Sequence, residues 1–258
     1  MKIQLLPSTI DENGVASDRQ HLLSMIVDDR VAVDAGCLAL SCSDRQREQV
    51  RDILLTHTHL DHIAGLPLFI DDLFASLTEP IRIHATRPMI DILERDIFNW
   101  AIYPRFSELS NKFGSVIEYR EFESGTSFDV QHLSVQSVHV NHQVSAVGYL
   151  ISDFESTVAI TGDTAETDEF WELCNQARSL KAVLVECAFP NELEQLSIDS
   201  NHLTPARLRL ELGKLSNKKV PVFIINLKPM YRDKVIQQIS GEVIPQAEIL
   251  KVGKVYDF

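Results

Sequence analysis

The stretch "LLTHTHLDHIAGLP", residues 54–67, places His57, His59, Asp61 and His62 within six positions directly after an apolar run. Where a chain leaves a sheet, two histidines separated by one residue can both turn toward one ion. Asp61 and His62 follow one turn later and can face a second ion. Imidazole and carboxylate ligands suit Zn²⁺, Mn²⁺ or Fe, and this set of ligands argues against a soft site built from thiolates. The stretch therefore predicts a metal centre, against the alternative of a histidine-rich surface loop.

Runs of β-branched residues along the rest of the chain predict buried strands, and helix-like stretches lie between them. This mixture favours an α/β or α+β fold in one domain, residues 1–258. Five apolar runs end at or just before a residue that can bind metal or move a proton. These residues are His57 with His59, His142, Asp163, Glu186 and Asn226. Strand ends can gather side chains that are distant in sequence, so we expect these groups to meet at one point.

The charge balance restricts the partners. The chain of 258 residues has a formal net charge of −13, which argues against a surface that follows a long nucleic acid, because such binding relies on Lys and Arg. A small anionic ligand remains possible. No stretch reaches the ~20 apolar residues that span a bilayer, and no secretory leader is recognisable. The four cysteines are scattered, so we expect free thiols, a cytoplasmic protein and no membrane partner.

A family resemblance adds to this. "VAVDAG", "THTHLDHIAGLP", "IFNWAIYPRF", "GDT", "VECAFPN", "HLTPARL" and "INLKP" occur in the order seen in class II 3′,5′-cyclic-nucleotide phosphodiesterases. The chain resembles this group, in the ribonuclease Z-like branch of the metallo-β-lactamase superfamily, from about residue 24 to about residue 238. The resemblance implies a four-layer αβ/βα sandwich with a dinuclear metal site between the sheets.

The resemblance also implies a ligand set. His57, His59 and His142 would hold the first ion, Asp61 and His62 the second, and Asp163 would bridge both. His139 lies three residues before His142 and is the competing candidate for the third histidine. Asp163 in "ITGDT" has the alternative of a simple turn aspartate.

One position departs from the family pattern. Where the family supplies a further histidine after the last core strand, this chain has Asn226 in "FIINLKP". An amide oxygen is a weaker ligand than imidazole. We therefore expect divalent ions, Zn²⁺ first with Mn²⁺ or Fe as alternatives, and a second site weaker than the first. Lys228 follows two residues later and either reaches a phosphate oxygen or is solvated.

The catalytic groups implied by the resemblance are Asp61, His202 and Glu186. Asp61 would position a metal-activated hydroxide that attacks phosphorus. Glu186 would fix the tautomer of His202, which would protonate the leaving alkoxide. The alternative makes His202 a residue flanking a helix and Glu186 a surface carboxylate. Asp34 either orients a ligand histidine or is a turn residue before Gly36.

The leading interpretation is a metal-dependent phosphodiesterase that hydrolyses 3′,5′-cyclic nucleotides, cyclic AMP or cyclic GMP, to 5′-nucleotides. The alternatives are a ribonuclease Z-like endonuclease for tRNA 3′ ends, a lactam, lactone or thioester hydrolase, and a catalytically weak metal-dependent nucleotide-binding protein. The expected partners are a small cyclic nucleotide and a second copy of the chain in a homodimer. One aromatic side chain of residues 98–106 could stack on a purine, although core packing or a subunit contact is the commoner role of such residues.

Overall fold

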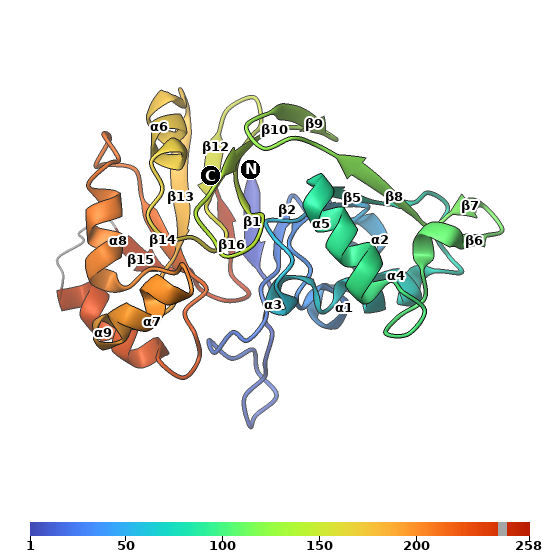
Figure 1. The fold of residues 1–258 in the computed structure, drawn as a ribbon, viewed down its shortest axis with the longest axis horizontal. Coiled ribbons are helices and arrows are strands. Elements are labelled where there is room, and N and C mark those ends of the chain that lie inside the picture. The colour runs from blue at the N-terminus through green and yellow to red at the C-terminus, as the bar shows by residue number, and fades with distance from the viewer. Residues whose placement is uncertain (242–246) are drawn as a thin grey trace.

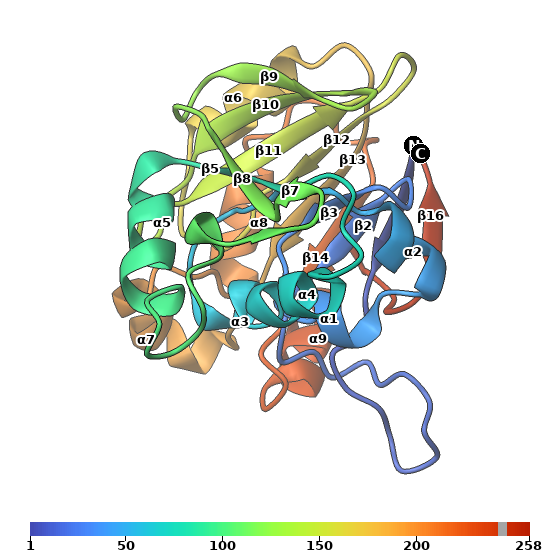
Figure 2. The ribbon, with the colours of Figure 1, turned by 90° about the vertical axis from the view of Figure 1, so that its right-hand side faces the viewer.

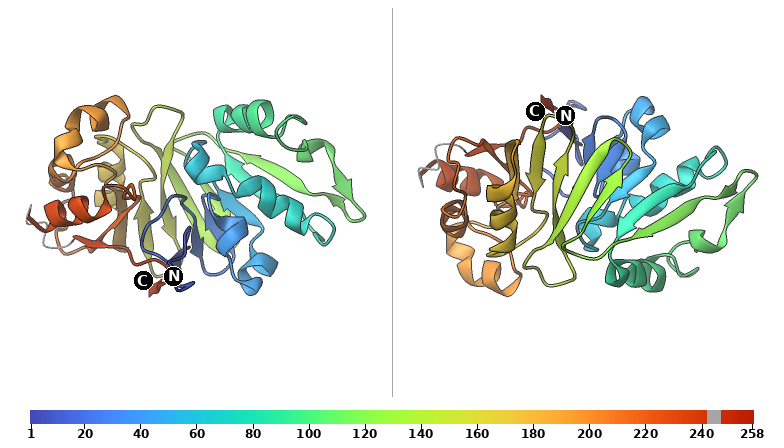
Figure 3. Two further views of the ribbon diagram at one scale, coloured as in Figure 1. Left: turned by 90° about the horizontal axis from the view of Figure 1, so that it is seen from below. Right: turned by 90° about the horizontal axis from the view of Figure 1, so that it is seen from above.

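The computed structural model describes residues 1–241 and 247–258. In this part of the chain, two seven-stranded sheets pack face to face and helices cover their outer faces (Figures 1 and 3). The predicted αβ/βα sandwich is therefore confirmed. A large cluster of buried apolar side chains from both sheets fills the space between them.

The first sheet is built mainly from the N-terminal half. Its strands, in spatial order, are β16 (Val255–Asp257), β1 (Lys2–Leu5), β2 (Met25–Val27), β3 (Val31–Val33), β4 (Asp52–Leu54), β5 (Ile81–Ala85) and β8 (Ile117–Glu121). β3, β4, β5 and β8 are parallel neighbours. Because β16 pairs with β1, the two chain ends lie side by side (Figure 1).

The second sheet comes from the C-terminal half. Its strands, in spatial order, are β15 (Ala247–Ile249), β14 (Val222–Ile225), β13 (Leu180–Glu186), β12 (Thr157–Ile160), β11 (Val147–Ser152), β10 (Leu133–His139) and β9 (Ser127–Val130). β12 to β15 run parallel, and β10 has the same direction because β11 is antiparallel to both β10 and β12. The carboxyl ends of β10, β12, β13 and β14 therefore meet at one edge, as the sequence pattern predicts.

Helices and short turns join these strands. The α-helices are α1 (Leu38–Ser41), α2 (Asp44–Gln49), α3 (Leu60–Ile63), α4 (Leu66–Leu73), α5 (Arg87–Ile92), α6 (Glu169–Gln176), α7 (Glu194–Asp199), α8 (Pro205–Leu212) and α9 (Arg232–Gly241). The shorter elements are the π-helix η1 (Leu93–Ile97), the 3₁₀ turns η2 (Phe106–Glu108) and η3 (Asn191–Leu193), and the hairpin of β6 (Ser110–Asn111) and β7 (Gly114–Ser115). The loop of residues 6–24 projects away from the sheets (Figure 2). No helix of the described residues is long and apolar enough to cross a membrane.

Local sequence explains where α8 begins and why α3 and α4 are separate helices. Thr204 caps the N-terminus of α8, since its side chain accepts a hydrogen bond from the Arg207 backbone. The helical segment that carries Asp61 is divided into α3 and α4 at Gly65. A Cβ at Gly65 would lie 2.6 Å from the carbonyl oxygen of Ala35, so only glycine lets these backbones pack this closely.

The aromatic segment 98–106 divides between core and surface. Phe98 and Phe106 are fully buried and pack edge to face. Trp100 has a positive φ of 67° and is 57% exposed. Core packing is therefore confirmed for Phe98 and Phe106, whereas Trp100 lies at the surface, where the subunit contact and the stacking role stay predictions.

Candidate metal centre

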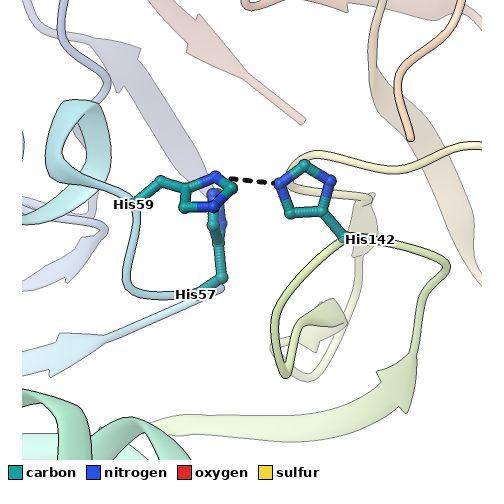
Figure 4. A group of neighbouring side chains, drawn as sticks. All are labelled: His57, His59 and His142. Atoms are coloured by element: carbon teal, nitrogen blue, oxygen red, sulfur yellow. Dashed lines mark hydrogen bonds between the residues drawn. The ribbon is translucent and has the colours of Figure 1, made fainter. Parts of the chain in front are cut away.

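Loops after β4 and β10 bring three histidines to one point. His57 and His59 come from the loop after β4, and His142 comes from the loop after β10. Nδ1 of His59 lies 3.0 Å from Nε2 of His142, and Figure 4 shows these two rings facing each other with His57 beside them. Nitrogen atoms of all three rings lie within 4.8 Å of one another. This arrangement can present three imidazole nitrogens to one ion.

A second set of donor atoms adjoins the first. Nε2 of His62 lies 3.4 Å from Oδ2 of Asp163 and 4.0 Å from Oδ2 of Asp61. Nε2 of His57 lies 3.8 Å from the same Asp163 oxygen. Asp163 thus stands between the two sets, and the structure brings together all six side chains that the sequence predicts as ligands.

Buried hydrogen bonds hold the loop after β4 in place. Asp34 accepts from the backbone N–H and the hydroxyl of Thr56, both at 2.8 Å, and its Oδ2 lies 2.7 Å from Nδ1 of His62. Asp34 is fully buried. The geometry therefore matches the orienting role considered for Asp34, because its carboxylate fixes which nitrogen of His62 faces the centre.

The donor atoms fit a divalent metal ion. Within residues 1–241 and 247–258, Nε2 of His57 and Nε2 of His62 are buried without any hydrogen-bond partner. Buried polar atoms are rarely left unpaired, so these two nitrogens point to a missing ligand. Burial holds the pKa of His57 well below its ordinary value, which keeps the ring in the neutral form that binds metals.

The acidic residue at the centre has its charge balanced by these rings. Burial alone would raise the pKa of Asp163, but His62 and His57 hold it well below its ordinary value. Burial alone would likewise lower the pKa of His62, but Asp163 and Asp34 raise it well above. Asp163 is therefore a carboxylate anion in the centre.

A glutamate–histidine pair lies directly beside these donors. Nδ1 of His202 is 2.8 Å from Oε1 of Glu186 and 3.9 Å from Oδ2 of Asp163. The His202 and His142 rings have centroids 5.1 Å apart. Glu186 is fully buried, which excludes the alternative of a surface carboxylate. Burial lowers the pKa of His202, but Glu186 outweighs it and raises the pKa above its ordinary value.

The loop of His202 is tied down by a residue that sequence reasoning missed. The guanidinium of Arg207 donates to the backbone oxygen of His202 at 2.7 Å and to the hydroxyl of Ser197. Its other face forms a bidentate pair with Glu166, in the loop that follows Asp163. Arg207 thereby links the loops that carry His202 and Asp163. Nothing in the sequence around Arg207, which lies in α8, signals this role.

Two polar residues after β14 reach the second set of donors. The Asn226 amide nitrogen donates a hydrogen bond to Oδ1 of Asp163. Nζ of Lys228 lies 2.9 Å from Oδ2 of Asp61. The alternative of a solvated Lys228 is therefore wrong, since the ammonium is ion-paired inside the centre.

The competing third histidine lies elsewhere. His139 is exposed at the end of β10 and belongs to none of the donor groups found among the described residues. Nδ1 of His142 is instead held by the backbone oxygen of Asn201 at 3.0 Å. The geometry thus favours His142 over His139.

Comparisons with known proteins identify the family of the chain. A family model described as a beta-lactamase superfamily domain matches residues 30–221. A probable 3′,5′-cyclic-nucleotide phosphodiesterase of Yersinia pestis is 26% identical over 210 residues, which are 72% of this chain and 59% of the relative. The chain therefore spans about three fifths of the length of that relative.

Solved structures share the fold. Unliganded yeast PDE1 superposes with a TM-score of 0.77 at 17% identity and 98% coverage of both chains. The short form of human tRNase Z gives a TM-score of 0.68 at 14% identity, covering 100% of this chain and 99% of that one. At such identities the likeness shows the architecture alone.

Proposed function

The chain belongs to the β-lactamase superfamily as a hydrolase whose side chains can bind a divalent metal, and from this premise we propose that it is a phosphodiesterase that hydrolyses 3′,5′-cyclic nucleotides to 5′-nucleotides. The relative named as such a phosphodiesterase supports the substrate class. The observation that carries the proposal is the buried Glu186–His202 pair beside the metal-binding histidines. This pair supplies an acid that can protonate the leaving alkoxide, which is a poor leaving group without a proton.

The residues divide the reaction between them. His57, His59 and His142 would hold a divalent ion, which would supply positive charge against the phosphate and make a water more acidic. Asp61 and Asp163 are placed to accept hydrogen bonds from the water that adds to phosphorus. As the bond from phosphorus to the 3′ oxygen breaks, Nε2 of His202 gives its proton to that oxygen, while Glu186 holds Nδ1.

The direction in which the pKa of His202 is shifted supports this role. Glu186 raises the pKa of His202 above its ordinary value, which favours the protonated form of the ring. The 3′ oxygen then leaves as a hydroxyl and the product is a 5′-nucleotide.

The test is product analysis on a panel of phosphodiesters. Protein reconstituted with Zn²⁺ or Mn²⁺ is incubated with cyclic AMP, cyclic GMP, bis-p-nitrophenyl phosphate and a precursor tRNA, and products are resolved by chromatography. We expect 5′-AMP or 5′-GMP and no 3′ isomers. Cleavage of the precursor tRNA without cyclic-nucleotide turnover would overturn the proposal in favour of the endonuclease. Nucleotide binding without any product would favour the binding protein.

A further inference from the structure

The two sets of donor atoms differ in what surrounds them. The set of His57, His59 and His142 contains imidazoles alone, and the outward nitrogen of His57 is buried without a partner in the described part of the chain. The set of Asp61, His62 and Asp163 already has protein cations and donors against its oxygens. Each set thus contains an unpartnered imidazole nitrogen, on His57 in the first and on His62 in the second. The sets differ because carboxylate oxygens of the second already face Asn226 and Lys228.

An ammonium group occupies the outer side of the second set. Nζ of Lys228 contacts the same Asp61 oxygen that faces His62. A metal ion on that oxygen, at the usual ~2.1 Å, would lie no farther than about 5 Å from the ammonium nitrogen. Like charges at this separation, with both side chains mostly withdrawn from solvent, repel each other. Lys228 therefore weakens the binding of a second ion.

The position of Lys228 is built into the fold. β14 ends at Ile225, and Asn226 has the left-handed backbone conformation that asparagine tolerates, with φ 51°. The turn lets the Asn226 amide donate to Asp163 and lets the Lys228 backbone N–H donate to the oxygen of Ala188 beyond β13. Asn226 thus presents an N–H donor to the Asp163 carboxylate, whereas a metal ligand presents a lone pair.

We propose that the centre holds one divalent ion, on His57, His59 and His142, and that the Lys228 ammonium, anchored by Asp61, is its second positive group and binds a phosphate oxygen of the substrate. The single-ion part stands on the donor geometry. The phosphate contact rests on the proposed function.

The test counts zinc ions per chain. Protein is saturated with Zn²⁺, freed of excess by gel filtration and analysed by plasma mass spectrometry, with titration calorimetry for the affinities. We expect one ion in the wild type and one in Asn226→His, because the ammonium stays in place. The double variant Asn226→His with Lys228→Met should hold two ions, and Asn226→His with Lys228→Arg should again hold one.

A matched control separates this from a general loss of charge. Lys214 is similarly exposed and ion-paired, to Asp168 and Glu211, and lies outside the donor groups found in the described residues. Asn226→His with Lys214→Met should hold one ion. Thermal unfolding verifies that each variant is folded.

Two zinc ions bound with similar affinity to the wild type or to Asn226→His would overturn the inference. The wild-type count does not depend on any variant folding. Two ions together with cyclic-nucleotide turnover would leave the proposed function standing. One ion without turnover of any phosphodiester would support the single-ion centre and overturn the proposed function.

Discussion

A single hydrogen bond determines which nitrogen of His202 can meet the substrate. Nδ1 is held by Glu186 at 2.8 Å, so Nε2 remains as the donor. The imidazole belongs to a neighbouring loop and not to the three-histidine set. His202 also forms a donor group with His142 and Asp163, so zinc content has to be measured beside kcat to separate proton transfer from metal binding.

At this scale we predict that His202→Ala lowers kcat for cyclic AMP by ~10²–10⁴, the usual contribution of a general acid. Zinc content should be unchanged. The matched control is His139→Ala, because His139 is an exposed histidine and its removal should leave both quantities as they are. Loss of zinc from His202→Ala would show that His202 is a ligand instead.

The carboxylate behind the ring predicts a pH dependence. Glu186 raises the pKa of His202, and the acid form is the active one, so kcat falls as the pH rises through that raised pKa. In Glu186→Gln the pKa falls, and the descending limb of the pH profile should move to lower pH. The measurement is kcat against pH for both proteins at saturating zinc. A limb that does not move would assign it to another group.

Between elements, the backbone at Gly36, after β3, packs directly against α3, the helix that carries Asp61. A Cβ at Gly36 would lie 1.9 Å from the backbone oxygen of Asp61 and 2.8 Å from backbone atoms of Leu23. Leu23 N–H also donates to that Asp61 oxygen at 2.8 Å. All of these atoms belong to the backbone and not to the end of a flexible side chain. A Cβ at Gly36 would therefore force the backbone of Gly36 apart from α3 and from Leu23.

We therefore predict that Gly36→Ala lowers the free energy of unfolding by at least the ~1–3 kcal/mol of an overpacked core. It should also weaken zinc binding, because the displaced loop carries His57 and His59. Urea unfolding and zinc titration measure the two effects. The control is Gly241→Ala, since a Cβ there meets nothing within 4 Å; equal losses in both variants would contradict the packing argument.

Much of this architecture is predictable from the sequence. The strands and contacts that are not predictable lack a local sequence pattern, for physical reasons. Continuous apolar runs predict buried strands such as β12 and β13, and the ends of these strands locate Asp163 and Glu186. The edge strand β16 is largely exposed and its neighbour β1 alternates in burial, so no apolar run marks either strand. The contact of Lys228 with Asp61 joins residues 167 apart, and no local pattern encodes such a distance.

At the scale of the whole molecule, the site exists because two sheets present strand ends to each other. Tyr149 on β11 donates to the backbone oxygen of Leu55 at 2.6 Å, and Val147 N–H donates to that of Thr56 at 2.9 Å. These bonds join the end of β4 to the start of β11, across the two sheets. The three histidines can converge only when both halves of the chain are folded together.

The charge of the whole molecule leads to the last prediction. A formal charge of −13 repels an anionic substrate over the Debye length, which shrinks from ~30 Å at 0.01 M salt to ~8 Å at 0.15 M. Added salt should therefore raise kcat/KM for cyclic AMP, by up to about tenfold in the range where binding limits the rate. A nucleic-acid enzyme that grips phosphates with basic residues shows the opposite trend, because salt weakens its binding. Stopped or continuous assays at constant pH and zinc, with sodium chloride as the only variable, distinguish the two. A steep fall in kcat/KM with added salt would contradict this prediction. It would mean that a basic surface captures the substrate, and not the Lys228 ammonium of a predominantly acidic molecule.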